Sequence, residues 1–109
     1  MAEITIVGLG PGAPDHLTRE AWKVLTAAET VWLRTLHHPV VAHLPDTVTL
    51  RSFDEDYESA DSFPAVYRAI AGRVLALARD GDVTYAVPGH PLVGESSVLL
   101  ILEGARQEA

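Results

Sequence analysis

Two loops rich in glycine and proline are the parts of this sequence best suited to hold a ligand. The first is Gly8-Leu9-Gly10-Pro11-Gly12-Ala13-Pro14-Asp15, and it directly follows a β-branched run at residues 4–7. No regular element can run through so many glycines and prolines, so we expect a shaped loop. Because glycine has no side chain, such a loop can bring backbone N–H and carbonyl groups close to an uncharged or zwitterionic ligand.

The first loop also satisfies the dinucleotide-binding pattern Gly-x-Gly-x-x-Ala at residues 8–13. In that motif the helix begins within the loop, and its free N–H groups bind pyrophosphate. Here Pro11 and Pro14 remove two donors, and the first predicted helix starts only near residue 18. Arg34 also stands where the motif has an acid at the end of the second strand. A nicotinamide or flavin site is therefore the less favoured interpretation.

The second loop is Pro88-Gly89-His90-Pro91-Leu92-Val93-Gly94, which follows a β-rich run at residues 83–87. It leads into Glu95-Ser96-Ser97, the predicted start of a helix whose free N–H groups would favour a carboxylate. His90 is either a substrate-orienting residue or a simple turn residue. On spacing alone, two tight turns without a ligand explain both loops equally well.

Other polar residues give weaker signals. Arg34 and Thr35 end the second predicted strand, so we expect them to contact a substrate at the ligand-binding edge. The acidic segment at residues 54–61 is too polar to bury and is predicted to be a solvated loop. No histidine shows a known metal-ligand spacing with a carboxylate, so we expect no metal at any of the five: His16, His37, His38, His43 and His90.

The pattern of apolar residues predicts the elements that position these loops. We expect strands at residues 4–7, 30–33, 47–50 and 83–87, and helices at 18–28, 62–80 and 95–106. Thr18 and Ser62 are suited to cap two of the helices, and Gly81 to end one in a left-handed conformation. This order predicts an α/β fold of three layers, with a mostly parallel sheet of about four to five strands flanked by helices. Ligands bind such sheets beyond the carboxyl ends of the strands.

Length and composition limit the classes of protein. The chain has 109 residues, which fits a single domain over residues 1–109. Its net charge of −7 disfavours nucleic acid and anionic membranes as partners. It has no cysteine, and its start lacks a basic signal-peptide region, so we expect a cytoplasmic protein.

Three segments together resemble the N-terminal half of the tetrapyrrole (corrin/porphyrin) methylase family. They occur in the family's order and spacing, and the resemblance runs from residue 4 to the end of the chain. The segments are Gly8-Leu9-Gly10-Pro11-Gly12 followed by Leu17-Thr18, then Arg34-Thr35 with His38-Pro39, then Tyr85-Ala86-Val87-Pro88-Gly89-His90-Pro91-Leu92-Val93. Where this chain has Pro-Gly-His in the last segment, the family commonly carries an aspartate.

The resemblance implies an S-adenosylmethionine-dependent methyltransferase, in which the cofactor lies in a cleft between two α/β domains. This chain would supply the N-terminal domain, and the C-terminal half would be absent. Arg34 and Thr35 would contact a small-molecule substrate such as a tetrapyrrole. The implied cofactor-binding residues are Gly8, Gly10, Pro11, Gly12, Pro88, Gly89, His90, Pro91 and Val93.

The resemblance also implies an alternative role. More narrowly, the sequence is similar to the methylase-like domain fused in front of a MazG-type nucleotide pyrophosphohydrolase. This similarity leaves open a non-catalytic binding or dimerisation module. The paired glutamate motifs of such hydrolases are missing from the helix predicted at residues 62–80. Without its second half the domain would expose an apolar face, so we expect it to form a homodimer.

Overall fold

The β-branched runs of the sequence form one parallel sheet. The computed structural model describes residues 2–59, 61–90 and 95–108. In this part of the chain the strands are β1 (Ile4–Gly8), β2 (Thr30–Leu33), β3 (Thr49–Ser52) and β4 (Val83–Val87). Their order in the sheet is β1-β4-β2-β3, and every neighbouring pair is parallel. All four carboxyl ends therefore meet at the same edge of the sheet.

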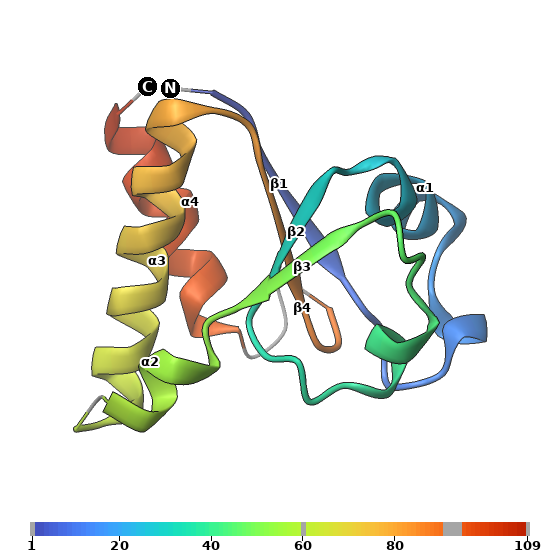
Figure 1. Cartoon of the computed structure of the whole chain (residues 1–109). Helices are drawn as coiled ribbons and strands as arrows, with labels where there is room; N and C mark the ends of the chain where they lie inside the picture. Colours follow the sequence, from blue (N-terminus) through green and yellow to red (C-terminus); the bar gives the residue numbers. More distant parts are fainter. Residues whose placement is uncertain (1, 60, 91–94, 109) are drawn as a thin grey trace.

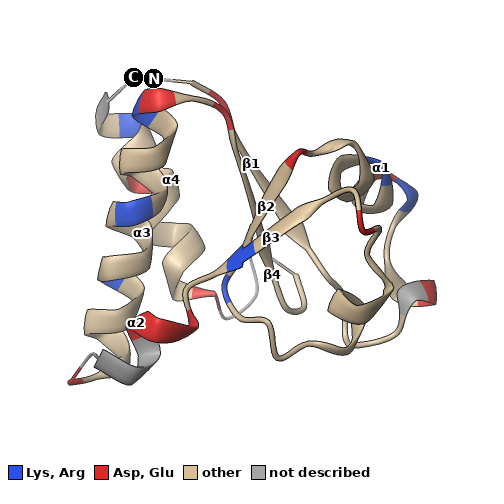
Figure 2. Ribbon diagram, in the orientation of Figure 1, with Lys and Arg blue, Asp and Glu red and all other residues tan. Residues whose placement is uncertain are grey.

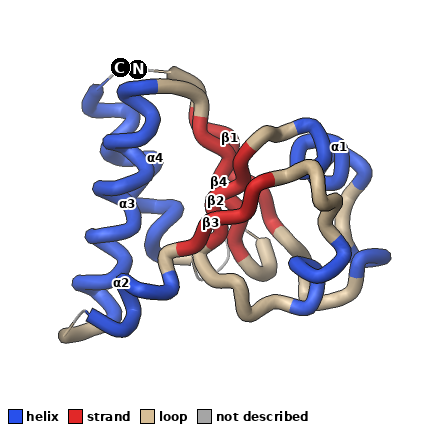
Figure 3. Tube along the Cα trace, in the orientation of Figure 1, coloured by secondary structure: helices blue, strands red, loops and turns tan. Residues whose placement is uncertain are grey.

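Helices cover both faces of this sheet (Figure 1). The long helices α3 (Phe63–Asp80) and α4 (Ser96–Glu108) pack side by side on one face, and α1 (Arg19–Ala27) lies on the other (Figure 3). The remaining helical segments are short: α2 (Asp54–Ser59) and the 3-10 helices η1 (Pro14–His16) and η2 (Pro39–His43). The predicted three-layer α/β fold is confirmed.

The two helical layers bury two separate cores against the central strand β4. Val83, Tyr85 and Val87 belong to the core on the α3–α4 side, whereas Ala86 belongs to the core on the α1 side. This division follows from the alternation of side chains along a strand. Because helices cover both faces, the strand reads as a nearly continuous apolar run. No helix in the described ranges is long and apolar enough to span a membrane.

The predicted helix caps are present, but one predicted helix end is wrong. The Thr18 hydroxyl accepts a hydrogen bond from the N–H of Ala21 at 3.0 Å, and the Ser62 hydroxyl accepts one from Ala65 at 3.3 Å. Each therefore satisfies a backbone donor that the first helical turn leaves unpaired. Gly81 was expected to end α3 in a left-handed conformation, but its φ is 173°, which is extended backbone. Any residue can adopt this extended backbone, so the conformation at position 81 does not require glycine.

One strand starts later than predicted. We expected it at residues 47–50, and β3 occupies Thr49–Ser52. The N–H of Val48 donates to the Pro45 carbonyl at 3.1 Å and closes a turn, so the first ladder hydrogen bond is made by Thr49, which donates to Glu29 at 2.8 Å. The alternation of residue types correctly predicted a strand. It did not predict the turn that shifts the start of this strand.

The acidic segment predicted to be a loop contains a helix. α2 occupies Asp54–Ser59, and Asp54, Glu55 and Asp56 lie in its first turn, where the positive end of the helix dipole stabilises them (Figure 2). In addition, Arg73 of α3 forms an ion pair with Asp56 at 2.9 Å. Polarity alone therefore did not exclude a helix.

Two glycines test how closely α3 and α4 approach each other. A methyl group at Gly72 in α3 would meet nothing within 4 Å, whereas one at Gly104 in α4 would collide with Leu75 Cδ1. We expect Gly72→Ala to raise the free energy of unfolding by about 0.5–1 kcal/mol, because alanine favours a helix more than glycine does. We expect Gly104→Ala to give a smaller gain or a loss, measured by urea denaturation. Equal gains for the two variants would contradict the close contact.

Candidate functional site

The two glycine-rich loops are joined to each other at the carboxyl edge of the sheet. Gly10 follows β1 and Gly89 follows β4, and the two residues form an isolated antiparallel bridge. The N–H of Gly10 donates to the Gly89 carbonyl at 3.2 Å, and the N–H of Gly89 donates to the Gly10 carbonyl at 3.0 Å. Both glycines have positive φ, +70° and +68°. Loops far apart in the sequence are therefore fixed against each other by backbone alone.

A third loop, which follows β2, reaches the same point. The Nε2 atom of His38 lies 3.0 Å from the Gly10 carbonyl oxygen. The Nδ1 atom of the same ring accepts a hydrogen bond from the N–H of Val40 at 3.2 Å, which caps η2. His38 belongs to one of the segments that resemble the family, but it was not among the predicted site residues. The signal that could have found it is a histidine directly before Pro39, at the start of a short helix that follows a strand.

A cavity of about 550 Å³ lies between these loops, β1 and α1. Its volume is within the range of small-molecule sites, roughly 300–1,000 Å³. Its lining combines loop backbone with side chains of β1 and α1, among them Thr18, Glu20 and Val24. Five of the residues predicted to bind a cofactor line it: Gly8, Gly10, Pro11, Gly89 and His90.

The other predicted site residues lie elsewhere. Gly12 and Pro88 belong to the same two loops but do not line the cavity. Pro91 and Val93 lie outside the described residues. Arg34 and Thr35 directly follow β2, which ends at Leu33, and they also do not line the cavity. In the described part of the chain, no three His, Cys, Asp or Glu residues gather closely enough to hold a metal ion.

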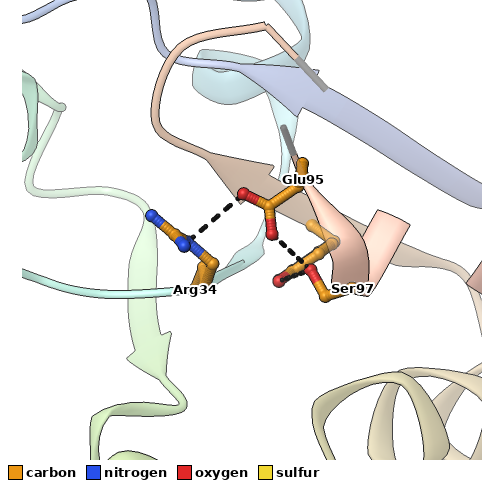
Figure 4. Close-up of polar contacts among 4 residues, drawn as sticks. Arg34, Glu95 and Ser97 are labelled. Carbon is orange, nitrogen blue, oxygen red and sulfur yellow. Dashed lines mark hydrogen bonds and ion pairs between the residues drawn. The ribbon is translucent and has the colours of Figure 1, made fainter. Parts of the chain in front are cut away.

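Arg34 is part of a buried polar network (Figure 4). Its Nε atom lies 3.5 Å from Glu95 Oε2 and has no hydrogen-bond partner in the described structure, so the contact is an ion pair without a well-formed hydrogen bond. Glu95 Oε1 accepts from the Ser97 hydroxyl at 2.6 Å, and that hydroxyl lies 2.8 Å from the hydroxyl of Tyr85. The network connects the end of β2 to the start of α4.

This network changes the expectation for the start of α4. The sequence suggested that the free N–H groups of this helix start would favour a ligand carboxylate. The structure places the protein's own carboxylate, Glu95, directly before the first residue of α4, and the residue is only 6% exposed. A second carboxylate at this position would meet like charge.

Thr35 and Asp54 connect the loop after β2 to α2. Asp54 Oδ2 accepts from the N–H of Leu36 at 2.9 Å. Burial raises the pKa of Asp54, but hydrogen bonds from Leu36, Thr35 and Ser52, with the charge of His37, outweigh burial and hold this pKa below its ordinary value of 3.8. The carboxylate form of Asp54 therefore stabilises the loop.

Fold and site define an α/β domain with a cavity that lies between β1, α1 and two bridged loops at the carboxyl edge of a parallel sheet. The tetrapyrrole (corrin/porphyrin) methylase model matches residues 3–109, and the chain belongs to this family. The uncharacterized protein YabN of Bacillus subtilis (strain 168) is 47% identical over 107 residues, which are 97% of this chain and 22% of that protein. The predicted resemblance to the tetrapyrrole methylase family is confirmed.

Solved structures with this fold include enzymes named uroporphyrin-III C-methyltransferase. One from Thermus thermophilus matches with a TM-score of 0.68 at 29% identity, over 98% of this chain and 44% of that chain. Another, complexed with S-adenosylhomocysteine, shares the fold with a TM-score of 0.62 at 23% identity, over 97% of this chain and 41% of that chain. This chain therefore spans less than half the length of these structures.

Gly10 and Gly89 form a matched pair for testing the loop bridge. At Gly10 a methyl group would lie 2.9 Å from the His16 carbonyl oxygen, whereas at Gly89 it would meet no atom of the described residues within 4 Å. Gly89→Ala changes only the cost of a positive φ, about 1 kcal/mol. We expect Gly10→Ala to lower the free energy of unfolding by clearly more than Gly89→Ala in urea denaturation. Equal losses would show that Gly10 is not closely packed.

Asp54 predicts a pH dependence of stability. Because its pKa is lower in the folded protein than its ordinary value of 3.8, its contribution is complete above that pH and disappears as the pH falls through the folded pKa. We expect Asp54→Asn to be less stable than the wild type at pH 7, with the difference closing below about pH 3.8 in thermal unfolding. A difference that is constant with pH would exclude the carboxylate charge as its cause.

Proposed function

We propose that this chain is the cofactor-binding half of an S-adenosylmethionine-dependent methyltransferase of the tetrapyrrole methylase type. The observation that carries the proposal is the bridge between Gly10 and Gly89, which brings two predicted cofactor loops to one cavity. Family membership supports the same reaction class. The name of the 29% identical Thermus enzyme is consistent with it.

The residues at the cavity suit this cofactor. Gly8, Gly10 and Gly89 lack side chains, so a ligand can approach their backbone groups closely. Pro11 and the apolar side chains of β1 and α1 offer surface for an adenosine or a methionine chain. Glu20 also lines the cavity, and its carboxylate is suited to the positive charge of the cofactor. The use of S-adenosylhomocysteine in one structure of this fold makes it a natural probe.

The chain's own residues would act mainly by alignment. The bound cofactor supplies an electrophilic methyl group on a sulfonium, and its leaving group departs neutral. The leaving group then needs no general acid, and positioning together with exclusion of water provides much of the catalysis. The bridged loops meet this need because backbone hydrogen bonds hold them in one arrangement.

Arg34 and Thr35 are proposed to contact the substrate. The Glu95 carboxylate fixes Arg34 at one end, and the Arg34 side chain is 22% exposed against 5% for Glu95. A guanidinium held in this way suits a carboxylate-bearing small molecule such as a tetrapyrrole. The sequence alone predicts the class of methyl acceptor, a homodimer, attachment to a hydrolase and a cytoplasmic location.

Calorimetric titration with S-adenosylhomocysteine tests the proposal. We expect binding to the longest natural protein that contains this chain, and at least about tenfold weaker binding to the 109-residue chain, because a cleft shared by two domains loses contacts when one is absent. His90→Ala should weaken binding about three- to tenfold, whereas His43→Ala, at an exposed residue of η2, should not. Absence of binding to both proteins, or preferential binding of a nicotinamide dinucleotide, would contradict the proposal.

A further inference from the structure

His38 uses both nitrogens of its ring to connect two parts of the chain. Its Nε2 atom lies 3.0 Å from the carbonyl oxygen of Gly10, which is 28 residues away in the sequence. Its Nδ1 atom lies 3.2 Å from the backbone nitrogen of Val40. The side chain is partly buried and does not line the cavity.

These partners fix the protonation of the ring. A carbonyl oxygen can only accept a hydrogen bond, so Nε2 must carry the hydrogen. A backbone N–H can only donate, so Nδ1 must present its lone pair to Val40. The contacts therefore require the neutral Nε2–H tautomer of His38. Rotation of the ring would break both hydrogen bonds.

The Gly10 carbonyl accepts two hydrogen bonds that come from different loops. Gly89 donates to it at 3.0 Å from the loop after β4, and His38 donates at 3.0 Å from the loop after β2. A carbonyl oxygen has two lone pairs, and both are used here. The backbone at Gly10 also has a positive φ and packs closely against His16. Glycine adopts this φ without strain, so the hydrogen bonds from Gly89 and His38 fix which conformation the loop takes.

We infer that His38 is a positioning residue for the cofactor-binding loop. It holds the Gly10 carbonyl in place, and through Gly10 it fixes the backbone of the loop that lines the cavity. The identity of the ligand in this inference rests on the proposed function. The effect of His38 on the loop rests on the structure alone. The role differs from that of a substrate or metal ligand, because His38 acts through Gly10.

Two substitutions separate the two hydrogen bonds of His38. In His38→Asn the side-chain oxygen sits near the position of Nδ1, so it can still accept from Val40 and cap η2. It is too short to reach Gly10. In His38→Gln the side-chain N–H₂ group sits near the position of Nε2, so it can still donate to Gly10. His43→Asn, at an exposed residue of the same short helix, is the matched control.

The first measurement needs no ligand. Amide hydrogen exchange of Gly89, whose N–H donates to the Gly10 carbonyl, reports the order of the bridge in the full chain. We expect exchange at Gly89 to be about three- to tenfold faster in His38→Asn, as expected for the loss of one ordinary hydrogen bond. In His38→Gln and His43→Asn it should stay within about twofold of the wild type. Equal exchange in His38→Asn and the wild type would overturn the inference.

The second measurement connects the bridge to the ligand. In calorimetric titration with S-adenosylhomocysteine, we expect His38→Asn to bind about three- to tenfold more weakly and His38→Gln to bind like the wild type. Unchanged binding by His38→Asn would overturn the cofactor-positioning role. If the wild type itself does not bind, the proposed function fails, and faster exchange at Gly89 would still support the effect of His38 on the loop. Equal melting temperatures of the variants would exclude general unfolding.

Discussion

The carbonyl oxygen of Gly10 is the point at which three loops of the ligand edge meet. It accepts hydrogen bonds from Gly89 and from His38, so the chain segments after β1, β4 and β2 are held together around one atom. The parallel sheet brings these segments to the same edge, but it does not fix them against one another. The hydrogen bonds at Gly10 provide that second constraint, and the shape of the cavity beside it depends on them.

A second polar network supports this edge from the α3–α4 side of the sheet. Tyr85, Ser97 and Glu95 form a buried chain of hydrogen bonds from β4 to the start of α4, and Arg34 pairs with its outer end. Buried polar groups of this kind are costly unless satisfied, so the network strongly constrains where α4 begins. The hydrogen bonds at Gly10 order the loops beside the cavity, and Glu95 pairs with Arg34 directly after β2.

The sequence was informative where the cause of structure is local. The β-branched runs and the apolar spacing of α3 predicted most of the sheet and its long helix. Parallel topology predicted that both glycine-rich loops lie at the carboxyl edge, but not the bridge between them. The predicted start of β3 was wrong because a turn at Pro45–Val48 delays the strand. The loop predicted at α2 was wrong because an ion pair with Arg73 stabilises a helix there. The roles of His38 and Glu95 depend on contacts with residues distant in the sequence or on burial, which residue types and spacing do not reveal.

Chemical-shift mapping by NMR tests the central claim most directly. In a titration of the ¹⁵N-labelled protein with S-adenosylhomocysteine, we expect the largest amide shifts at Gly8, Gly10, Gly89 and His90, because these residues line the cavity. The amide of Gly72, on the exposed side of α3, should not move. Shifts concentrated on α3 and α4, with none at the bridged loops, would contradict the assignment of this edge as the cofactor site.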